Sequence, residues 1–528
     1  MRWFLLLSLL VSVALKAQEG SFEISKAKFK YELVKAQQAS ENAKYDIALE
    51  IYRQLLLSEP EHPECLYHNA EIYYQLGYYD DALDWIIRLK ALADKEIPRS
   101  LTNKVELLAA RIFYQHHDIS NCLSHLDTYI SNASELDLEK EKIPQWITQI
   151  SNFRRAALPE LEVVLAPEIT GLNSAFDDLS AAVNWADSTL YFSSKRPISM
   201  ADSTSSLSWK NSRESVEAIY KTYGRSVQRV FDLADYHLGL LSFHPSEDLL
   251  YVYQSDAGAG DVFYSKKSGK KNTWSKPRAF TELNSSYYES SMVVSPDGNY
   301  LFFVSERLDG YGDGDIYYCK KEGKSSWSLP KNLGPLVNST QDEKYVSIHP
   351  NGETLIFASN KAGGFGSYDF YKVTFRDSVI GPVDHFPYPI NSPGEESFMS
   401  FDQLLQKVFI VSQRAGGKGQ RDIYTTDFTA SFLNYTSQLD STLLFVEGRI
   451  TSLKANKNKS GLVRVYADGK LQGMAVVDDE GRFDISLFPG TKYEVVYSDW
   501  GLKKSAVKTW QTPTSIDKGA SIYINYPG

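Results

Sequence analysis

Three patterns of hydrophobic and polar positions follow one another along the chain. Between residues 25 and 160, apolar residues recur three and four positions apart, which is the spacing of one face of an α-helix. From about residue 161 to 430, the apolar residues form short runs such as Tyr300–Ser305, separated by turns rich in glycine, proline, asparagine and aspartate. Short alternating runs continue beyond residue 444. The pattern predicts a multidomain chain that is α-helical first and all-β afterwards.

The helical segment contains an internal repeat. Tyr45–Leu49 recurs 34 residues later as Tyr79–Leu83, and a weaker third copy follows around Ala110 after a shift of 40 residues. Small residues at equivalent places allow the two helices of a hairpin to approach closely. The spacing resembles the tetratricopeptide repeat. We therefore expect a helical solenoid over residues 22–158, ending in a capping helix near Ile143–Ala156.

The β-rich segment contains a second repeat with a longer period. Asn284 recurs as Asn338 and Asn391, at shifts of 54 and 53 residues, and a Pro-Asp-Gly or Pro-Asn-Gly turn follows the first two. Roughly 53 residues with four candidate strands is the size of one propeller blade. Five copies predict a five-bladed β-propeller over residues 161–432.

The ends of this repeat region indicate how the propeller closes. Glu162–Leu165 precedes the first copy in the way that an outer strand precedes each later copy. We expect this strand to join the blade that contains Val408–Val411, which would link the first blade to the fifth and protect the exposed strand edges.

Acidic residues recur at fixed places in the blades. A glutamate follows each repeated asparagine by five residues, and an aspartate opens each third candidate strand. The residues are Glu289, Glu343, Glu396, Asp315, Asp369 and Asp422. A catalytic site needs different groups that converge once, whereas a scaffold needs the same group in every blade. We therefore expect structural residues, with the glutamates buried and hydrogen-bonded near blade junctions; the paired carboxylates of a five-bladed glycosidase are the alternative.

A third module follows the propeller repeat. Candidate strands at Val446–Ile450, Gly461–Tyr466 and Lys492–Val495 are separated by turns that contain glycine. Their number and spacing predict a small β-sandwich over residues 443–528.

The N-terminus and the composition limit where the protein acts. Arg2 and the short apolar run Trp3–Leu15 resemble a secretory signal, with cleavage expected after Ala17, and no later stretch is long enough to cross a bilayer. The formal net charge of −10 gives no electrostatic footprint for nucleic acid. Three scattered cysteines are too few for a disulfide framework or a zinc site.

Motifs for catalysis or cofactor binding are absent from the sequence. There is no G-x-S-x-G, no H-E-x-x-H and no phosphate-binding glycine loop. The adjacent His116 and His117 point in different directions on a helix, which disfavours a metal site. Asp309–Asp315 alternates acids with glycines and could wrap calcium, but the equivalent segments keep only the last aspartate, which favours a structural hairpin. We expect no enzymatic activity, no cofactor and no bound metal.

Several of these features together resemble a known family. One repeat is similar in sequence to TolB-like propeller repeats. It contains Ser295-Pro-Asp-Gly298, then Leu-Phe-Phe-Val-Ser-Glu-Arg and later Asp-Ile-Tyr. The last module resembles the transthyretin-like regulatory domain of carboxypeptidases. The order of signal, tetratricopeptide units, propeller and regulatory-like domain resembles PorE-type proteins of Bacteroidetes.

The resemblance implies a periplasmic accessory protein of the type IX secretion system, which also serves gliding motility. It implies envelope-protein partners, such as an outer-membrane protein of the PorP/SprF kind, and association with the outer membrane through them. PorE-type proteins end in an OmpA-like domain that holds peptidoglycan, whereas this chain ends at Gly528. Direct peptidoglycan binding therefore does not carry over.

The helical repeats suggest where a partner would bind. The first helix of each tetratricopeptide hairpin lines a concave groove, and the repeat register places five side chains there. They are Tyr67, Glu71, Tyr74, Arg111 and Tyr114. The alternative is that these tyrosines pack against the next helix, Tyr67 first among them. The predicted function is a non-enzymatic periplasmic scaffold; the alternative is a propeller that binds or processes glycans.

Overall fold

The computed structural model describes most of the chain after the first 25 residues. The described ranges are 26–92, 97–156, 163–165, 171–196, 216–223, 226–231, 233, 237–255, 260–268, 273–323, 326–402, 407–427, 432–434, 442–452, 460–500, 505–514 and 520–526. The predicted signal segment 1–17 lies outside these ranges. Within them, no helix has the length and hydrophobicity needed to cross a membrane, and Cys65, Cys122 and Cys319 are free and buried.

The N-terminal region is helical, as its apolar spacing predicts. Its described helices are α2 (Lys26–Glu41), α3 (Tyr45–Ser58), α4 (Pro63–Gln75), α5 (Tyr79–Lys90), α6 (Arg99–Gln115), α7 (Ile119–Asn132), the short α8 (Glu135–Lys140) and α9 (Ile143–Arg155). Consecutive helices pair as the hairpins α2–α3, α4–α5 and α6–α7. The expected capping helix is α9, and α8 is an extra turn begun by Ser134, whose hydroxyl and backbone exchange hydrogen bonds with Asp137.

Small residues explain why these hairpins pack so closely. Ala36 and Ala48 in the first hairpin, and Ala70 and Ala82 in the second, have no exposed surface. Ala110 and Cys122 hold the equivalent positions in the third hairpin and are also fully buried. A larger side chain at any of these places would have to push two helices apart.

The described residues between 164 and 427 form five antiparallel sheets. The first contains β2 (Asp178–Asn184), β3 (Thr189–Ser194), β4 (Ala218–Tyr223) and β5 (Ser226–Arg229). The second contains β6 (His237–Phe243), β7 (Leu249–Ser255), β8 (Asp261–Ser268), β9 (Thr273–Trp274) and β10 (Arg278–Ala279). The third contains β11 (Glu289–Val294), β12 (Tyr300–Ser305), β13 (Asp315–Lys320) and β14 (Lys331–Asn332). The fourth contains β15 (Glu343–Ile348), β16 (Thr354–Ser359), β17 (Asp369–Arg376) and β18 (Val379–His385).

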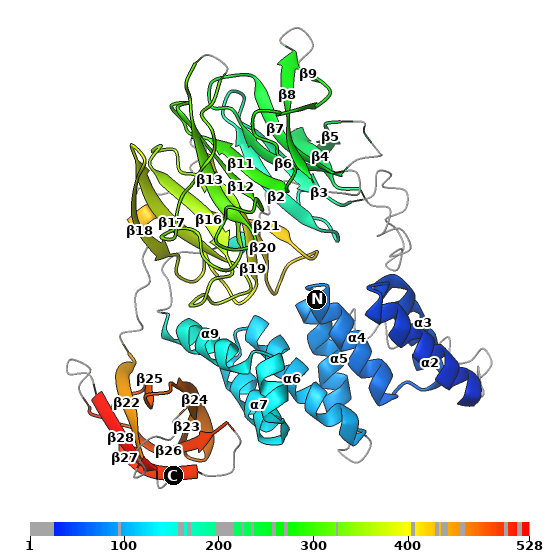
Figure 1. Cartoon of the computed structure of the whole chain (residues 1–528). Coiled ribbons are helices and arrows are strands. Elements are labelled where there is room, and N and C mark those ends of the chain that lie inside the picture. The colour runs from blue at the N-terminus through cyan, green and yellow to red at the C-terminus, as the bar shows by residue number, and fades with distance from the viewer. Residues whose placement is uncertain are drawn as a thin grey trace.

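The fifth sheet joins the start of this region to its end. It contains β19 (Glu395–Asp402), β20 (Lys407–Gln413), β21 (Asp422–Asp427) and, from before the first sheet, β1 (Val164–Leu165). The pairing of β1 with β21 confirms the prediction that this early strand joins the sheet of Val408–Val411. The first strands of neighbouring sheets contact one another in the closed cycle β2, β6, β11, β15, β19 and back to β2. We call this arrangement the sheet ring (Figure 1).

Tight turns connect the first and second strands of the sheets. In the third sheet, Gly298 donates a backbone hydrogen bond of 2.8 Å to the Ser295 carbonyl, and its φ of +72° favours glycine. Gly352 repeats this turn in the fourth sheet with the His349 carbonyl, at 2.9 Å and a φ of +75°. The Pro-Asp-Gly and Pro-Asn-Gly motifs therefore predict the positions of these turns correctly.

The last strands form two facing sheets around one hydrophobic core. One has the order β25 (Arg482–Leu487), β22 (Leu444–Ser452) and β28 (Ala520–Tyr526), and the other β24 (Lys470–Val477), β23 (Gly461–Ala467), β26 (Lys492–Asp499) and β27 (Ser505–Gln511). In the sequence, the short 3-10 helix η4 (Phe432–Asn434) lies between the strands of the sheet ring and these last strands. Aliphatic residues and the rings of Tyr493 and Tyr497 fill the core.

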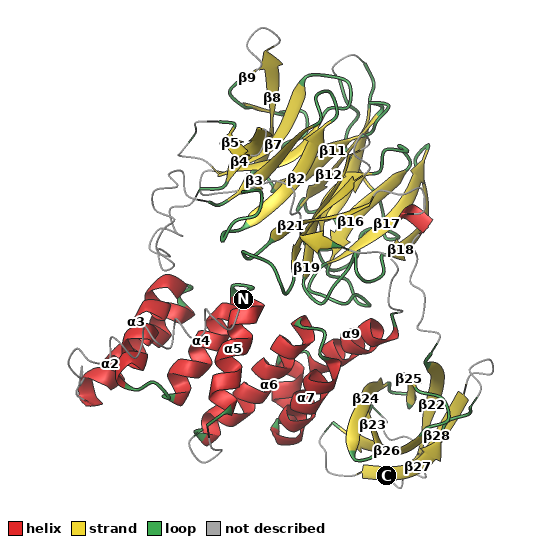
Figure 2. Ribbon diagram, turned by 180° about the vertical axis from the view of Figure 1, so that it is seen from behind, coloured by secondary structure: helices red, strands yellow, loops and turns green. Residues whose placement is uncertain are grey.

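The helical region lies along one end of the sheet ring, and the last seven strands lie beside its α7 and α9 (Figures 1 and 2). On one side, α6 and α9 meet the loops at one end of the ring. On the other side, α7 and α9 pack against β24, and Leu462 and Met474 join a hydrophobic core with residues of α6, α7 and α9. The helices therefore connect the two β-rich parts.

Candidate functional site

The repeated glutamates serve as internal anchors of the sheet ring. Glu343 has no exposed surface; its carboxylate accepts hydrogen bonds from the Ser339 backbone N–H at 2.8 Å, from the Ser339 hydroxyl at 2.7 Å and from the Ser359 hydroxyl at 2.7 Å. Glu289 and Glu396 are equally buried, as predicted, and accept the same set of bonds from serines at equivalent positions. Each carboxylate ties the loop before a first strand to the end of the second strand.

A cation completes two of these three anchors directly. The Arg307 guanidinium lies 3.1 Å from Glu289, and that of Arg414 lies 2.9 Å from Glu396. Lys361 holds the equivalent position beside Glu343, and its ammonium lies 3.8 Å from the centre of the Tyr371 ring. Burial raises the pKa of Glu343 and lowers the pKa of Lys361 to about 8.

The repeated aspartates close the loops between second and third strands. One oxygen of Asp369 accepts hydrogen bonds from the Phe365 and Gly366 backbone N–H groups at 3.0 and 2.9 Å. Asp422 does the same for Lys418 and Gly419 at 2.6 and 2.9 Å. Burial raises the pKa of Asp422 to about 6.

The segment proposed as an alternative calcium loop uses its carboxylates in the same way. Asp315 accepts a hydrogen bond from the Tyr311 backbone N–H at 2.5 Å, and Asp309 accepts one from the Tyr317 hydroxyl at 3.0 Å. In the described part of the chain, no cluster of three or more His, Cys, Asp or Glu side chains has the arrangement of a metal site. The hydrogen bonds of Asp315 and Asp309 within the segment favour the hairpin interpretation.

The five residues predicted to line an open groove do not form one. Tyr67 is buried and donates its hydroxyl hydrogen to Glu71 at 2.8 Å, so it packs inside as the alternative proposed. Tyr114 is 3% exposed and donates to the Phe365 carbonyl of the sheet ring at 2.8 Å. The expectation of a free groove was wrong at Tyr67, which packs within the core of the helices, and at Tyr114, which the sheet ring covers. Arg111 forms an ion pair with Glu141 at 2.8 Å.

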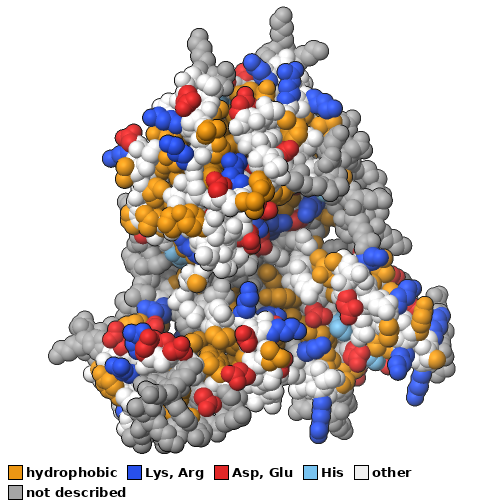
Figure 3. All heavy atoms as spheres, in the orientation of Figure 1, with side chains coloured by type: hydrophobic (Ala, Val, Ile, Leu, Met, Phe, Trp, Pro, Cys, Tyr) orange, Lys and Arg blue, Asp and Glu red, His pale blue; other side chains and the backbone are white. Residues whose placement is uncertain are grey.

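Tyr74, Arg111 and Tyr114 instead line a cavity of about 820 Å³ between the helices and the sheet ring. We call this cavity the interdomain cleft; Figure 3 shows the molecule hollowed between these two parts. Its helical wall also contains Trp146 and the exposed Gln145. Loops of the third, fourth and fifth sheets form its other wall.

The ring side of this cleft was missed by sequence reasoning. Gln149 donates to the Gly366 carbonyl at 3.0 Å, and Gln115 donates to that of Pro393 at 2.9 Å. The only sequence feature that indicated this contact was the glycine-rich sequence of the β16–β17 loop. A Cβ on Gly366 would lie 1.9 Å from the Gly394 carbonyl oxygen, so the glycine permits two adjacent loops to touch.

A second cavity, of about 470 Å³, opens at the same end of the sheet ring, where the first strands begin. We call it the channel pocket. An ion-pair network crosses its wall: Arg421 binds Asp177 at 2.8 Å and Glu395 at 3.3 Å, and Lys195 lies 3.4 Å from Asp177. These charges hold the pKa of Asp177 below its usual range, against the effect of burial.

The backbone of the channel pocket is unusual at one position. Tyr345, one of its lining residues, has a φ of +53°. This left-handed conformation costs a non-glycine residue about 1–3 kcal/mol and is common at binding sites. Tyr345 lies between Lys344 and Val346, where the register between β15 and β16 shifts.

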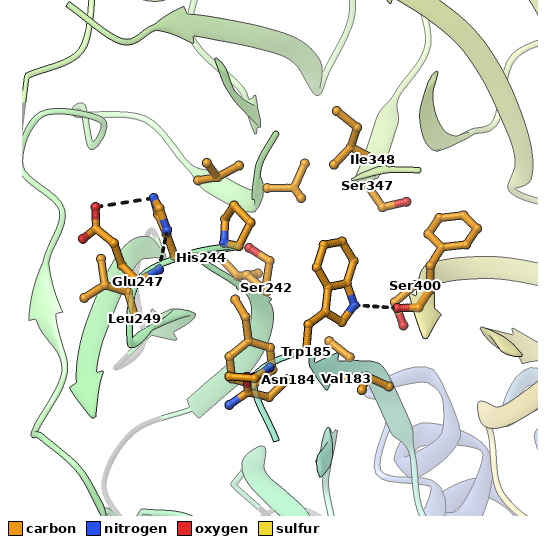
Figure 4. A pocket seen from close by; sticks show the side chains of 18 of the residues that line it. Val183, Asn184, Trp185, Ser242, His244, Glu247, Leu249, Ser347, Ile348 and Ser400 are labelled. Carbon is orange, nitrogen blue, oxygen red and sulfur yellow. Dashed lines mark hydrogen bonds and ion pairs between the residues drawn. The ribbon is translucent and has the colours of Figure 1, made fainter. Parts of the chain in front are cut away.

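The opposite end of the ring holds a smaller, mostly apolar cavity of about 260 Å³ (Figure 4). The Trp185 indole stands between Ser242 and Ser400 in this view, and its N–H donates to the Phe401 carbonyl at 3.0 Å. Ser242 and Ser400 donate their hydroxyl hydrogens to backbone carbonyls of neighbouring first strands. These serines therefore join adjacent sheets and are not arranged around a base.

Comparison with known proteins identifies one part of the chain. Residues 39–102 match the model of the tetratricopeptide repeat, so this part of the helical region contains such repeats, which suggest protein interaction. A search of curated protein sequences finds no match.

Solved structures resemble the chain only distantly. A protein assigned as TolB from Agrobacterium tumefaciens is 13% identical, with a TM-score of 0.29 over 50% of this chain and 78% of that one. The gluconolactonase XC5397 from Xanthomonas campestris is 12% identical, with a TM-score of 0.32 over 52% and 91%. An alpha-L-arabinofuranosidase from Lactobacillus brevis is 10% identical, with a TM-score of 0.33 over 52% and 95%. These TM-scores are too low to support a functional assignment.

Proposed function

We propose that the protein is a non-enzymatic periplasmic scaffold that holds an extended segment of an envelope protein in the interdomain cleft. The observation that carries this proposal is that helices α4, α5, α6 and α9, of which α4 and α5 lie within the tetratricopeptide match, line one cavity together with loops of the sheet ring. A segment bound there would contact both parts at once, so neither part alone would reproduce the site.

We also propose the finer architecture that the repeats predicted. The five sheets are the blades of a TolB-like propeller over residues 161–432, and the last seven strands are a transthyretin-like sandwich over residues 443–528. The closed cycle of first strands and the shared core of the two last sheets support this assignment. The helical domain extends over residues 22–158.

The side chains of the interdomain cleft suit a peptide. Exposed Gln145, Thr148 and Gln341 can donate and accept hydrogen bonds along an extended backbone. Trp146 and Tyr74 offer aromatic surface, which contributes binding energy out of proportion to its amount. A segment of a few residues fits the cavity volume.

The repeated carboxylates support a function without catalysis. Glu289, Glu343 and Glu396 are fully buried and already hydrogen-bonded to three groups each or more. A general acid or nucleophile must reach its substrate, and these groups do not.

The partner that we propose is an outer-membrane protein of the PorP/SprF kind, within type IX secretion or gliding. The support is the order of the domains, which resembles that of PorE-type proteins. Association with the outer membrane would then depend on the bound partner.

A capture experiment from crosslinked envelopes tests this function. In the variant Gln145→Arg/Thr148→Arg, two long cations enter the interdomain cleft and should obstruct it. The matched variant Thr128→Arg/Ser131→Arg adds the same charge on α7 and its C-terminal edge, where the residues are exposed and do not line the cleft. We expect mass spectrometry to recover a PorP/SprF-like protein with the wild type and the control, and at least about tenfold less with the cleft variant, if the obstruction removes 1.4 kcal/mol of binding free energy or more. Equal recovery with both variants would reject the cleft as the binding site.

A further inference from the structure

The channel pocket combines aromatic rings with carboxylates. Tyr253 and Tyr288 line it with their ring centres 5.7 Å apart. Glu217, from the strand edge of the first sheet, and Glu306, just after β12, face the same cavity. At about 470 Å³, the cavity has the size of a ligand site, and it opens at the end of the ring that the helices approach.

The charges around this cavity do not balance. Lys195 and Arg421 are paired with Asp177 and Glu395, and Lys344 is paired with Asp342 at 2.9 Å. Within the described residues, neither Glu217 nor Glu306 has an ion-pair partner within 4 Å. His237 accepts a hydrogen bond from the Glu217 backbone N–H at 3.2 Å, and burial lowers the pKa of this histidine, which favours its neutral form. Burial raises the pKa of both Glu217 and Glu306, which favours their neutral forms. With both ionised, the three cations Lys195, Arg421 and Lys344 face five carboxylates, so the excess charge is then negative, and a bound cation would favour this ionised state.

Glycines make room for the side chains that line the pocket. A Cβ on Gly239 would lie 2.9 Å from a Glu217 carboxylate oxygen, and one on Gly260 would lie 1.9 Å from the Tyr253 ring. Gly314 likewise accommodates Asp342, to which its backbone N–H donates at 3.1 Å. The side chains of Glu217 and Tyr253 are thus packed against backbone and held in place.

The same wall already contains a cation bound in this way. The Lys344 ammonium lies 4.7 Å from the centre of the Tyr368 ring, and Asp342 accepts a hydrogen bond of 2.6 Å from the Tyr368 hydroxyl. A carboxylate and an aromatic face together stabilise a cation more than either group alone. Tyr253, Tyr288, Glu217 and Glu306 offer the same two kinds of group. The cations that act on these glutamates, Lys195, Arg421 and Lys344, are paired with other carboxylates.

We propose that the channel pocket binds the cationic side chain of a lysine or arginine carried by the partner segment. This inference rests on the proposed function, since the segment in the interdomain cleft would supply the basic residue. The guanidinium or ammonium group would lie against the tyrosine rings and between the Glu217 and Glu306 carboxylates.

Two short peptides test the proposal with the full chain. Acetyl-Gly-Arg-Gly-amide carries the cation, and acetyl-Gly-citrulline-Gly-amide has nearly the same shape without the charge. We expect saturation-transfer NMR titrations to give at least about tenfold tighter binding of the arginine peptide. Equal binding of the two peptides, or tighter binding of the neutral sugar cellotriose, would overturn the proposal.

Variants locate the binding. Glu217→Gln and Glu306→Gln should each weaken binding of the arginine peptide about 3- to 10-fold and leave citrulline binding unchanged. Glu322→Gln makes the same charge change at an exposed residue of the β13–β14 loop and should have no effect. Thermal unfolding verifies that each variant is folded, and if Glu217→Gln unfolds, Glu306→Gln alone decides. An effect as large for Glu322→Gln would show that only the overall charge matters.

The cation-binding proposal and the proposed function can be rejected independently of each other. If the envelope partner is captured through the interdomain cleft but the arginine peptide does not bind, only the cationic specificity is wrong. If the peptide binds but the cleft variant captures the partner as well as the wild type does, the proposed cleft function is wrong.

Discussion

A lysine in place of an arginine distinguishes the anchor of the fourth sheet from its neighbours. Arg307 and Arg414 reach their buried glutamates within 3.1 Å, whereas Lys361 leans over the Tyr371 ring and no ion pair with Glu343 forms within 4 Å among the described residues. A guanidinium presents five donors in a planar fork, and an ammonium is a compact point charge on a flexible stem. Glu343 therefore lacks the charge-assisted hydrogen bond that its equivalents accept.

Restoring the arginine should stabilise the protein. In Lys361→Arg, the guanidinium can reach Glu343 as Arg414 reaches Glu396, which adds a hydrogen bond to a buried charge worth about 1–2 kcal/mol. We expect the midpoint of thermal unfolding of the sheet ring to rise by about 2–4 °C. The reverse change, Arg414→Lys, is the matched control and should lower it. A lower midpoint for Lys361→Arg would show that the site has no room for the fork.

At the scale of the element, four asparagines each bind one sheet to the sheet before it in the ring. Asn338 accepts a hydrogen bond from the Ile316 backbone N–H at 2.8 Å and donates one to the Ile316 carbonyl at 3.0 Å. Asn391 does the same for Phe370, and Asn284 for Val262. Asn173 holds Ile423 of the fifth sheet in this way, so it closes the ring together with β1.

Replacing Asn173 should lower the free energy of unfolding by more than the loss of its side-chain packing alone would. Asn173→Ala leaves the buried N–H and C=O of Ile423 without these partners, at about 1–3 kcal/mol for each group. We expect a loss of about 2–4 kcal/mol in the free energy of unfolding, measured by urea denaturation.

Asn284→Ala is the control for this prediction. It deletes the same two bonds between sheets that are consecutive in the chain, so its ring stays closed by β1 and Asn173. We expect Asn173→Ala, but not Asn284→Ala, to expose the 163–165 segment to proteolysis. A loss below about 0.5 kcal/mol for Asn173→Ala would contradict the closing role.

The elements could be predicted from the sequence because each repeats a local signal. The alanine positions, the Pro-Asp-Gly turns and the strand that joins the fifth sheet all follow from spacing and register. The burial of Glu343 could also be predicted from the sequence, because a carboxylate that recurs in every repeat is more typical of a structural role than of a catalytic one. The hydrogen-bond partners of the asparagines could not be predicted. Each asparagine binds backbone groups of the preceding sheet, and any residue type can supply those groups.

The whole molecule is held together by contacts that no repeat encodes. Phe153 of α9 packs its ring against Phe365 and Tyr388 of the sheet ring, with centres 5.6 and 5.4 Å away. Asp127 of α7 accepts hydrogen bonds from the Arg464 guanidinium at 2.5 Å and from the Tyr466 hydroxyl at 3.0 Å. These contacts join positions hundreds of residues apart. The predicted groove was therefore wrong at Tyr114 because the sequence alone does not tell which surface covers another.

The Asp127–Arg464 pair should control how the last seven strands dock. Arg464 is 6% exposed, so Asp127→Ala would leave a buried guanidinium without its carboxylate, at about 3–5 kcal/mol. We expect the last seven strands to separate from the helices, with a larger radius of gyration in small-angle X-ray scattering.

An apolar pair is the matched control for this prediction. Asp127→Leu/Arg464→Met removes both charges and keeps similar volume, so docking should persist. An unchanged radius of gyration for Asp127→Ala would show that the apolar contacts of Leu462 and Met474 suffice to hold the last strands in place.

Site-specific photocrosslinking in intact envelopes tests the central claim most directly. The photoreactive residue p-benzoylphenylalanine is placed at Gln145 in the interdomain cleft or at Thr128 on the outer side of α7, both of which are exposed. The scaffold account predicts that the Gln145 probe crosslinks to a PorP/SprF-like outer-membrane protein and that the Thr128 probe does not. Crosslinking of that protein from Thr128 but not from Gln145 would contradict the account.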